Sequence, residues 1–170
     1  MASTISAATL TVTLQESITL NGVDYGEFRE IEIGSINEVS SRIVNVPTSK
    51  KTVAIFSAST VGVGQHLLAN VKYLRITNLD DTNYVEVIIT RVNEDVPDGF
   101  GGTTPAIPGA IFKLEAGKAI MVGTASSGFG VEKHANGSTE VASANFGNLS
   151  KITVKANTAA VDVQVFVAST

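Results

Sequence analysis

Residues 161–167, VDVQVFV, decide the fold of this chain, because every second residue in them is valine. Successive side chains of a β-strand point to opposite faces, so the four valines share one face. Residues 9–14, TLTVTL, alternate in the same way, and their three apolar side chains also share a face. We therefore predict a half-buried strand near each end of the chain.

The composition extends this pattern to the segments between the two ends. Val, Ile and Thr together make 53 of the 170 residues, and β-branched side chains favour pleated strands over helices. Leu67, Val71 and Leu74 have helical spacing, which predicts no more than a short turn of helix before a strand. We expect further strands near residues 28–33, 41–46, 52–57, 71–77, 84–92, 110–115, 118–123 and 150–155.

Turn residues separate these strands. Asn21-Gly22 tolerates positive φ and divides the first strand from the next, and Ala116-Gly117 makes a second tight connection. Residues 79–83, LDDTN, join two well-patterned strands and predict a hairpin loop. Two long loops, 93–109 and 124–148, are rich in Gly, Pro, Ser or Asn, and loops of that length are usually functional or mobile.

Short strands with long loops predict an all-β fold, an antiparallel β-sandwich. The arrangement we expect is a jelly roll of about eight to ten strands. No Ser- or Pro-rich linker and no internal repeat divides the chain, so residues 9–170 are predicted to form one domain. Residues 1–8, MASTISAA, are small and uncharged, and we expect them to form an extended N-terminal arm, with a frayed terminus as the commoner alternative.

Charge and composition exclude several classes of protein. The chain has no Cys, which excludes thiol chemistry, disulfides and zinc ribbons. Its net charge is −4, and its only adjacent basic pair is Lys50-Lys51, whereas a nucleic-acid binder needs clustered Lys and Arg. With no Trp and three Tyr, the chain also makes a poor base-stacking platform. We expect no nucleic-acid partner.

Two segments bear on membranes and secretion. Residues 52–71 are uncharged but contain Ser, Gly, Gln, His and Asn, which is too much polarity for a hydrocarbon core. The first fifteen residues contain no basic residue and no compact apolar stretch. We therefore expect neither a membrane span nor a secretory signal.

Histidines and carboxylates are the candidate catalytic or metal-binding groups. His66 and His134 accompany no G-x-S-x-G elbow and form no His-x-His pair, so we interpret both as solvated loop residues. Two groups of oxygen-bearing side chains could offer ligands to Ca²⁺, but neither has EF-hand spacing, and Asp and Asn also bond their local backbone in turns. These groups are Asp80, Asp81 and Asn83, and Glu94, Asp95 and Asp98.

The glycine-rich stretches give no better candidate. Residues 99–102 and 127–130 are not followed by Lys-Ser or Lys-Thr and open no predicted helix, so they lack the features of a phosphate loop. The acidic run at 27–32 is interpreted as a solvated strand face. We expect no catalytic residue, no cofactor, no metal site and no enzymatic activity.

The predicted strand at 84–90 suggests a role in assembly instead. Val85, Val87 and Ile89 share one face, while Tyr84 and Ile88 lie on the other. A row of apolar residues on an outer face indicates that a neighbour covers it, although a sandwich with a slightly apolar exterior explains the pattern equally well.

Three blocks of the chain resemble small tailed-phage virion proteins. The first is the strand-turn-strand segment at 71–87, VKYLRITNLDDTNYVEV. The second, at 112–122, is FKLEAGKAIMV, and the third joins ITVKA at 152–156 to AVDVQVFV at 160–167. Their shared order covers roughly the second half of the chain, and the segment at 10–22 is similar more loosely.

The resemblance implies a jelly-roll protein that decorates or cements the capsid, located on the capsid surface and made in the host cytoplasm. Its implied partners are the major capsid protein or other virion proteins, and further copies of itself, with a trimer favoured. Two alternatives stay open. One is a receptor- or carbohydrate-binding head of a phage fibre, for which we expect glycan binding through the two long loops, with or without Ca²⁺. The other is a neck or tail adaptor.

Overall fold

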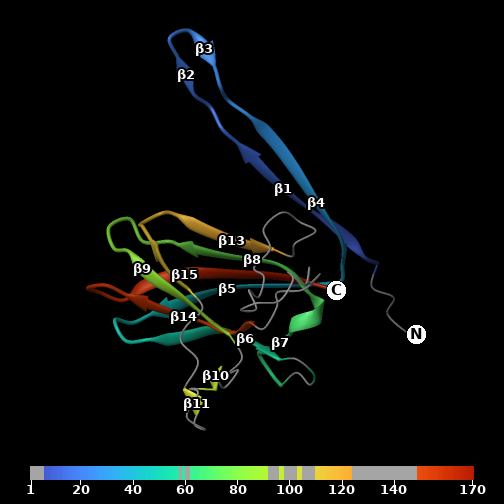
Figure 1. Cartoon of the computed structure of the whole chain (residues 1–170), viewed down its shortest axis with the longest axis vertical. Helices are drawn as coiled ribbons and strands as arrows, with labels where there is room; N and C mark the ends of the chain where they lie inside the picture. Colours follow the sequence, from blue (N-terminus) through green and yellow to red (C-terminus); the bar gives the residue numbers. More distant parts are fainter. Residues whose placement is uncertain are drawn as a thin grey trace.

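The computed structural model describes residues 6–57, 59, 62–91, 96–97, 103–104, 110–123 and 149–170. Its described residues form two β-sheets that lie face to face, together with a long hairpin that stands away from them (Figure 1). The all-β fold with antiparallel sheets is therefore confirmed. All ten strands expected from the sequence are present, within a few residues of their predicted bounds.

The two sheets share a simple plan. The β8 sheet has the strand order β13-β8-β15-β5, and the β9 sheet has the order β12-β9-β14-β6-β7. Every pairing is antiparallel except that of β6 with β7, which is parallel. The strands of the β8 sheet are β13 (Ala119–Gly123), β8 (Val71–Asn78), β15 (Val161–Ser169) and β5 (Glu38–Val46); those of the β9 sheet are β12 (Ala110–Leu114), β9 (Val85–Arg91), β14 (Leu149–Ala156), β6 (Lys51–Ser57) and β7 (His66–Leu67).

The core lies between these sheets and follows the alternation of the sequence. The four valines of β15 at 161–167 are at most 2% exposed, and Leu74 and Ile152 are equally buried. Each fully buried side chain of this size contributes about 1.5–3 kcal/mol of transfer free energy. On β9, Val85, Val87 and Ile89 share the face that lies in this core, and Ile88 on the opposite face is also buried, at 4% exposed.

The prediction of a hairpin at residues 79–83 is wrong. This loop joins β8 to β9, and these strands belong to different sheets, so the chain crosses the sandwich here. The same Asp- and Asn-rich turn chemistry serves a hairpin and a crossover, and the sequence alone does not distinguish them. The predicted short turn of helix before β8 is present as a 3₁₀ turn at Leu68–Asn70.

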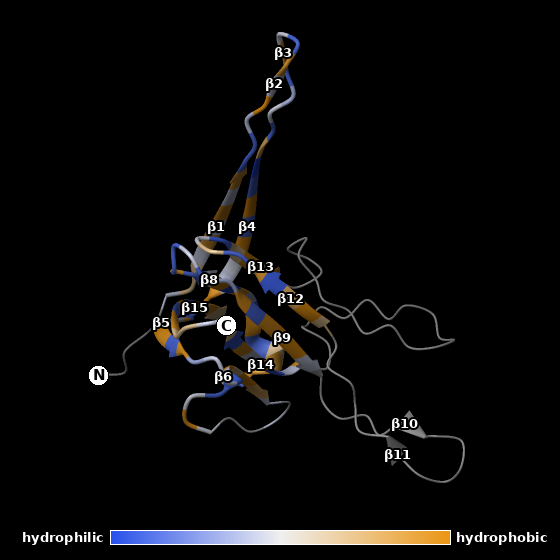
Figure 2. Cartoon of the chain, turned by 90° about the vertical axis from the view of Figure 1, so that its left-hand side faces the viewer, coloured by the Kyte–Doolittle hydropathy of each residue, from blue (hydrophilic) through white to orange (hydrophobic). Residues whose placement is uncertain are grey.

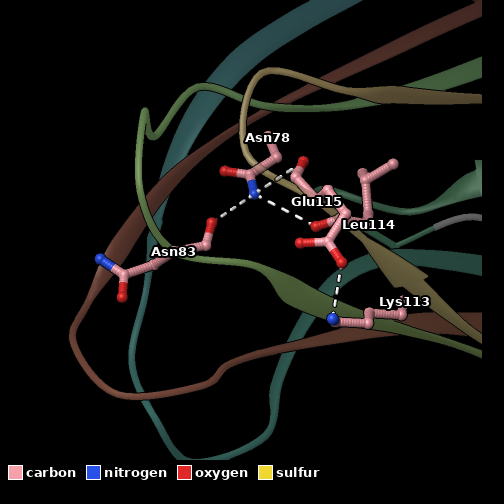
Figure 3. A network of polar contacts seen from close by, with 5 residues as sticks. All are labelled: Asn78, Asn83, Lys113, Leu114 and Glu115. Atoms are coloured by element: carbon pink, nitrogen blue, oxygen red, sulfur yellow. Dashed lines mark hydrogen bonds and ion pairs between the residues drawn. The ribbon is translucent and has the colours of Figure 1, made fainter.

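Asn78 holds this crossover in place (Figure 3). Its side chain is fully buried, and its Nδ2 lies 2.8 Å from the carbonyl oxygen of Asn83 and 3.2 Å from those of Leu114 and Glu115. Its Oδ1 accepts a hydrogen bond from the backbone N–H of Asp80 at 3.1 Å. One buried amide therefore ties the β8–β9 crossover to the end of β12.

Residues 8–36, which we call the arm, form the hairpin that stands away from the sandwich. It consists of β1 (Ala8–Gln15) paired with β4 (Phe28–Ile36), and of β2 (Thr19–Leu20) paired with β3 (Val23–Asp24). At its end Asn21 and Gly22 have φ angles of 53° and 78°, the values of a type I′ turn, so the predicted turn is confirmed. Both figures show the arm projecting well beyond the sheets (Figures 1 and 2).

The base of the arm packs on the outer face of the β8 sheet. Val12, Ile33 and Ile36 are at most 9% exposed, and they form a second apolar cluster with Tyr73 and Ala168 of the sheet. Leu10, Ile31, Met121 and Phe166 lie partly buried around this cluster. The arm is thus anchored at one end by its own small core.

Several features expected from the sequence lie wholly or partly outside the described residues. Residues 1–5 of the expected N-terminal arm lie outside the described residues, and Ala8 already belongs to β1. The loop at 124–148 lies outside them entirely, and within 93–109 only the paired strands β10 (Val96–Pro97) and β11 (Thr103–Thr104) are described. In the part of the chain that is described, no helix has the length and apolar character needed to cross a membrane.

Candidate interaction surface: the projecting arm

The end of the arm carries large apolar side chains in solvent. Ile18, Leu20, Val23 and Tyr25, which we call the tip, are between 52% and 61% exposed. Phe28, just below them, is 63% exposed. Single exposed apolar residues are ordinary on a protein surface, whereas a group of them at the end of a projection is typical of a binding surface.

The backbone of the arm keeps these side chains together. Gln15 pairs with Phe28 and Thr19 with Asp24, so the register passes through the middle of the arm with no inserted residue. The N–H of Glu16 donates to the carbonyl of Glu27 at 2.8 Å, and that of Tyr25 donates to Ile18 at 2.9 Å. Because residues two apart share a face of a strand, Ile18 and Leu20 lie beside Tyr25 and Val23.

Gly26 is required for this arrangement. A Cβ atom at Gly26 would lie 2.6 Å from the backbone oxygen of Glu16, which is closer than real Cβ contacts allow. The N–H of Gly26 also donates to Oδ1 of Asp24 at 2.8 Å. A side chain at this position would push the two strands apart just below the tip.

The net charge of the arm equals that of the whole protein. Residues 8–36 contain five acidic residues and one basic residue, a net charge of −4, which equals the net charge of the chain. Glu30 and Glu32 are exposed on β4, in agreement with the solvated acidic face expected from the sequence. Glu16 and Glu27 lie opposite each other, and Arg29 contacts Glu27 at 3.4 Å in an exposed ion pair.

The histidine prediction needs one correction. His66 lies in β7 rather than in a solvated loop, half-buried with its ring centroid 6.0 Å from that of Phe56. Burial, assisted by the positive charge of Arg42, lowers the pKa of His66, while Glu38 acts in the opposite direction. The parallel pairing of β7 with β6 brings this histidine against the sheet edge, and a single polar-flanked histidine gives no sequence signal for that pairing. His134 lies outside the described residues.

The carboxylate of Asp80 forms hydrogen bonds within its own turn. Its Oδ1 accepts hydrogen bonds from the N–H of Asn83 at 2.6 Å and of Thr82 at 2.8 Å, and these bonds lower the pKa of the carboxyl group. This is the turn chemistry favoured by the sequence. Glu94, Asp95 and Asp98 lie outside the described residues, as do the glycine-rich stretches 99–102 and 127–130.

A shallow acidic hollow lies beside this turn. It has a volume of about 390 Å³, and Asp80, Asp81 and Asp162 line it together with Asn45, Leu79 and Ala160. Asp162 accepts a hydrogen bond from Asn45 at 2.8 Å, and Asp81 accepts one from the hydroxyl of Thr82 at 3.0 Å, so all three of its carboxylates have partners within the protein. Among the described residues, no group of three or more His, Cys, Asp or Glu side chains is placed to hold a metal ion.

The projecting arm is the feature of the fold that the sequence did not reveal. Its strands and its turn were expected, but as part of the sandwich. Two signals could have identified it: the apolar residues that flank Asn21-Gly22, and the concentration of the net charge in residues 8–36. A test for charge along the chain in windows of this length would have separated the arm from the neutral remainder.

Comparison with known proteins identified no relative of this chain. The chain matches no family model, and no significantly similar protein was found among curated proteins or solved structures. The resemblance to tailed-phage virion proteins therefore stays a prediction.

Proposed function

We propose that this protein is a non-enzymatic structural protein of a phage particle, a decoration or cement protein that stabilises the capsid by linking neighbouring subunits. The observation that carries the proposal is the apolar tip at the end of an anchored arm. An exposed group of four large apolar side chains is costly for a protein in solution and is expected to be covered in an assembly.

The strand order supports the jelly-roll form of this proposal. Eight sandwich strands are arranged as β13-β8-β15-β5 and β12-β9-β14-β6, so strands that follow one another in sequence mostly lie in opposite sheets. Numbered one to eight along the chain, the sheets read 6-3-8-1 and 5-4-7-2, the interleaved order of two Greek keys rolled together. This topology is common among viral capsid proteins, which is an argument from analogy.

The mechanism follows from mass action. A protein that binds the assembled shell but not its free subunits stabilises the assembled state. The arm supplies the contact with a neighbour, and the sandwich supplies a rigid body from which it extends. Homo-oligomers, with a trimer as the preferred form, would present several arms at once and bind through multivalency.

The test compares a tip variant with a surface control on capsids stripped of this protein. Ile18→Ser, Leu20→Ser and Tyr25→Ser, combined, should weaken binding by at least about tenfold, and the temperature at which decorated shells release DNA should fall to that of bare shells. The control, Ile43→Ser, removes a 65%-exposed apolar side chain from β5 and should bind as the parent does. Full binding by the tip variant would refute a role for the arm.

The same particles distinguish the other virion roles. A neck or tail adaptor would bind isolated portal or tail assemblies and leave shells bare. A fibre head would bind neither and would recognise a host glycan.

A further inference from the structure

The two strands of the arm form a ribbon that has two outer edges. Among the described residues, β1 pairs with β4 alone and β4 with β1 alone, so the side of each strand that faces away from the other has no strand beside it. Along such an edge, every second residue directs its backbone N–H and C=O groups outward. An edge of this kind can accept a further strand from another chain, so both edges are candidate interaction surfaces.

The hydrogen bonds in the middle of the arm show which residues point outward. The N–H of Glu16 donates to the carbonyl of Glu27, and the N–H of Tyr25 donates to that of Ile18, so these two pairs are bonded across the ribbon. Bonded and non-bonded pairs alternate along an antiparallel ladder, and the register is the same from residue 10 to residue 20. The outward-pointing groups therefore belong to Thr11, Thr13 and Gln15 on β1 and to Phe28, Glu30 and Glu32 on β4.

The two edges differ in the features that protect a strand from pairing. β1 is eight residues long, and its sequence ATLTVTLQ contains no charged residue, no Pro and no Gly. β4 carries Arg29, Glu30 and Glu32, and it has one extra residue near Ser35, whose φ is 62°. Charged side chains and bulges are the usual means by which natural proteins blunt an edge strand. The edge of β4 is therefore protected, whereas the edge of β1 is open.

The outer edge of β1 is also accessible. Thr11, Thr13 and Gln15 are exposed, and Leu10 and Leu14 are only half-buried. Of the two strands of the arm, β4 lies closer to β8 and β15 of the sandwich. A third strand beside β1 would bond the outward N–H and C=O groups and cover the exposed sides of the two leucines.

The arm of a second copy does not fit beside β1. Two arms paired along β1, with their apolar faces on the same side, would form a sheet in which the centres of the arms lie about 10 Å apart. Each arm packs through Val12 and Ile33 on its own β8 sheet, and that sheet of four strands is itself about 14 Å wide. The two sandwiches would overlap, whereas a single extended segment adds one strand at about 4.8 Å.

We propose that the outer edge of β1 binds an extended segment of a shell subunit, which adds to the arm as a third strand. The segment alternates apolar residues, which lie beside the leucines of β1, with basic or polar residues on the face of Thr11 and Thr13. Basic residues suit that face because Glu30 and Glu32 lie opposite the two threonines and the arm has a net charge of −4. The inference rests on the proposed binding to the shell and adds a second contact, below the tip.

The first measurement is amide hydrogen exchange of the full chain, free and bound to capsids stripped of this protein. In the free protein, the N–H groups of Thr11 and Thr13 should exchange fast, and that of Leu14, which is bonded to β4, should exchange slowly. On the shell, exchange at the two threonines should slow by at least about tenfold, while Glu30 and Glu32 on the other edge should not change. Fast exchange at the threonines of bound protein would overturn the inference.

The second measurement compares two proline variants at opposite positions of the ribbon. Thr13→Pro removes an outward N–H from the edge of β1, and Glu30→Pro removes the outward N–H of its partner from the edge of β4. Neither change removes a bond between β1 and β4, because each N–H faces away from the ladder. Thr13→Pro should weaken binding to stripped capsids by at least about tenfold, and Glu30→Pro by less than about twofold.

Equal binding by the two variants would overturn the inference, whether both bind fully or both fail, because the contact would then not belong to the edge of β1. Slow exchange at Leu14 shows that the arm of each variant is folded. The tip variant tests the proposed function separately. If the tip variant fails to bind while Thr13→Pro binds as the parent does, docking through the tip stands without a third strand; if all variants bind fully, both proposals fail.

Discussion

The sandwich and the arm are built from the same kinds of residue, yet apolar side chains are buried in the sandwich and exposed at the end of the arm. In the sandwich, Leu74 and Val163 are completely buried between two sheets. In the arm, Leu20 and Tyr25 are 57% and 61% exposed, although they also lie in or beside paired strands. Figure 2 shows this contrast as hydrophobic segments that continue along the arm into solvent.

This difference shows that two strands can pair without burying their apolar side chains. An isolated two-stranded hairpin is marginally stable in water, and the arm is held by its type I′ turn at one end and by the cluster around Val12 and Ile33 at the other. The stretch between them has no second layer to cover its apolar residues. It is available for another molecule.

The largest effect is expected in the sandwich core. Leu74→Ala should lower the free energy of unfolding by about 3–4 kcal/mol, since it removes buried methyl groups and leaves a cavity. Leu20→Ala in the tip should change it by less than about 0.5 kcal/mol. Urea denaturation measures both, and equal losses would mean that the tip is buried within its own chain.

The next effect is expected at the crossover between the sheets. Asn78→Ala should lower the free energy of unfolding by about 2 kcal/mol, because buried carbonyl groups that now receive hydrogen bonds from its amide would lose them. Asn45→Ala is the control, since the hydrogen bond from Asn45 to Asp162 is exposed. Thermal unfolding of the two variants gives the comparison, and similar melting temperatures would contradict it.

A smaller effect on global stability, confined to one region, is expected at the base of the arm. Ile33→Ala opens the contact between the arm and the β8 sheet, so amide hydrogen exchange should accelerate in residues 8–36. The sandwich should keep its protection, with a change in global stability below about 1 kcal/mol. Faster exchange throughout β8 and β15 would show that arm and sandwich unfold together. Ile43→Ala, at an exposed position of the same sheet, serves as the control.

The smallest effect is expected from pH. The pKa of His66 is lower in the folded protein than its usual value of 6.5, so the unfolded chain binds the proton first as pH falls. Stability contributed by the neutral side chain is complete above pH 6.5 and declines as pH falls from there toward the folded-state pKa. Replacing the residue by His66→Gln should flatten the pH dependence of the melting temperature in this window, and an unchanged slope would contradict the assignment.

The strands were predictable because alternation is a local property. The valines of β15 and the three apolar residues of β1 identify both segments as strands without any knowledge of the fold. Which strands pair with one another was harder to predict from the sequence. Residues 79–83 have the composition of a hairpin loop and connect two different sheets, a distinction that depends on Asn78 reaching the end of β12.

For the candidate interaction surface, the sequence showed which residue types are present but not where they lie in the fold. It showed the turn at Asn21-Gly22 and the acidic run at 27–32. The protruding position of the arm was not visible, because alternating Leu10, Val12 and Leu14 have the same pattern whether they cover a core or only the outer face of a sheet.

What the sequence alone determined is therefore the strand content, the turns and the concentration of negative charge in residues 8–36, all of which depend on neighbours along the chain. The tertiary structure decided which apolar residues are buried. Ile33 packs on Tyr73 and Ala168, while Ile18, in the same hairpin, lies beyond the sheet. Burial requires a second layer at the right distance, and residues remote in sequence supply that layer.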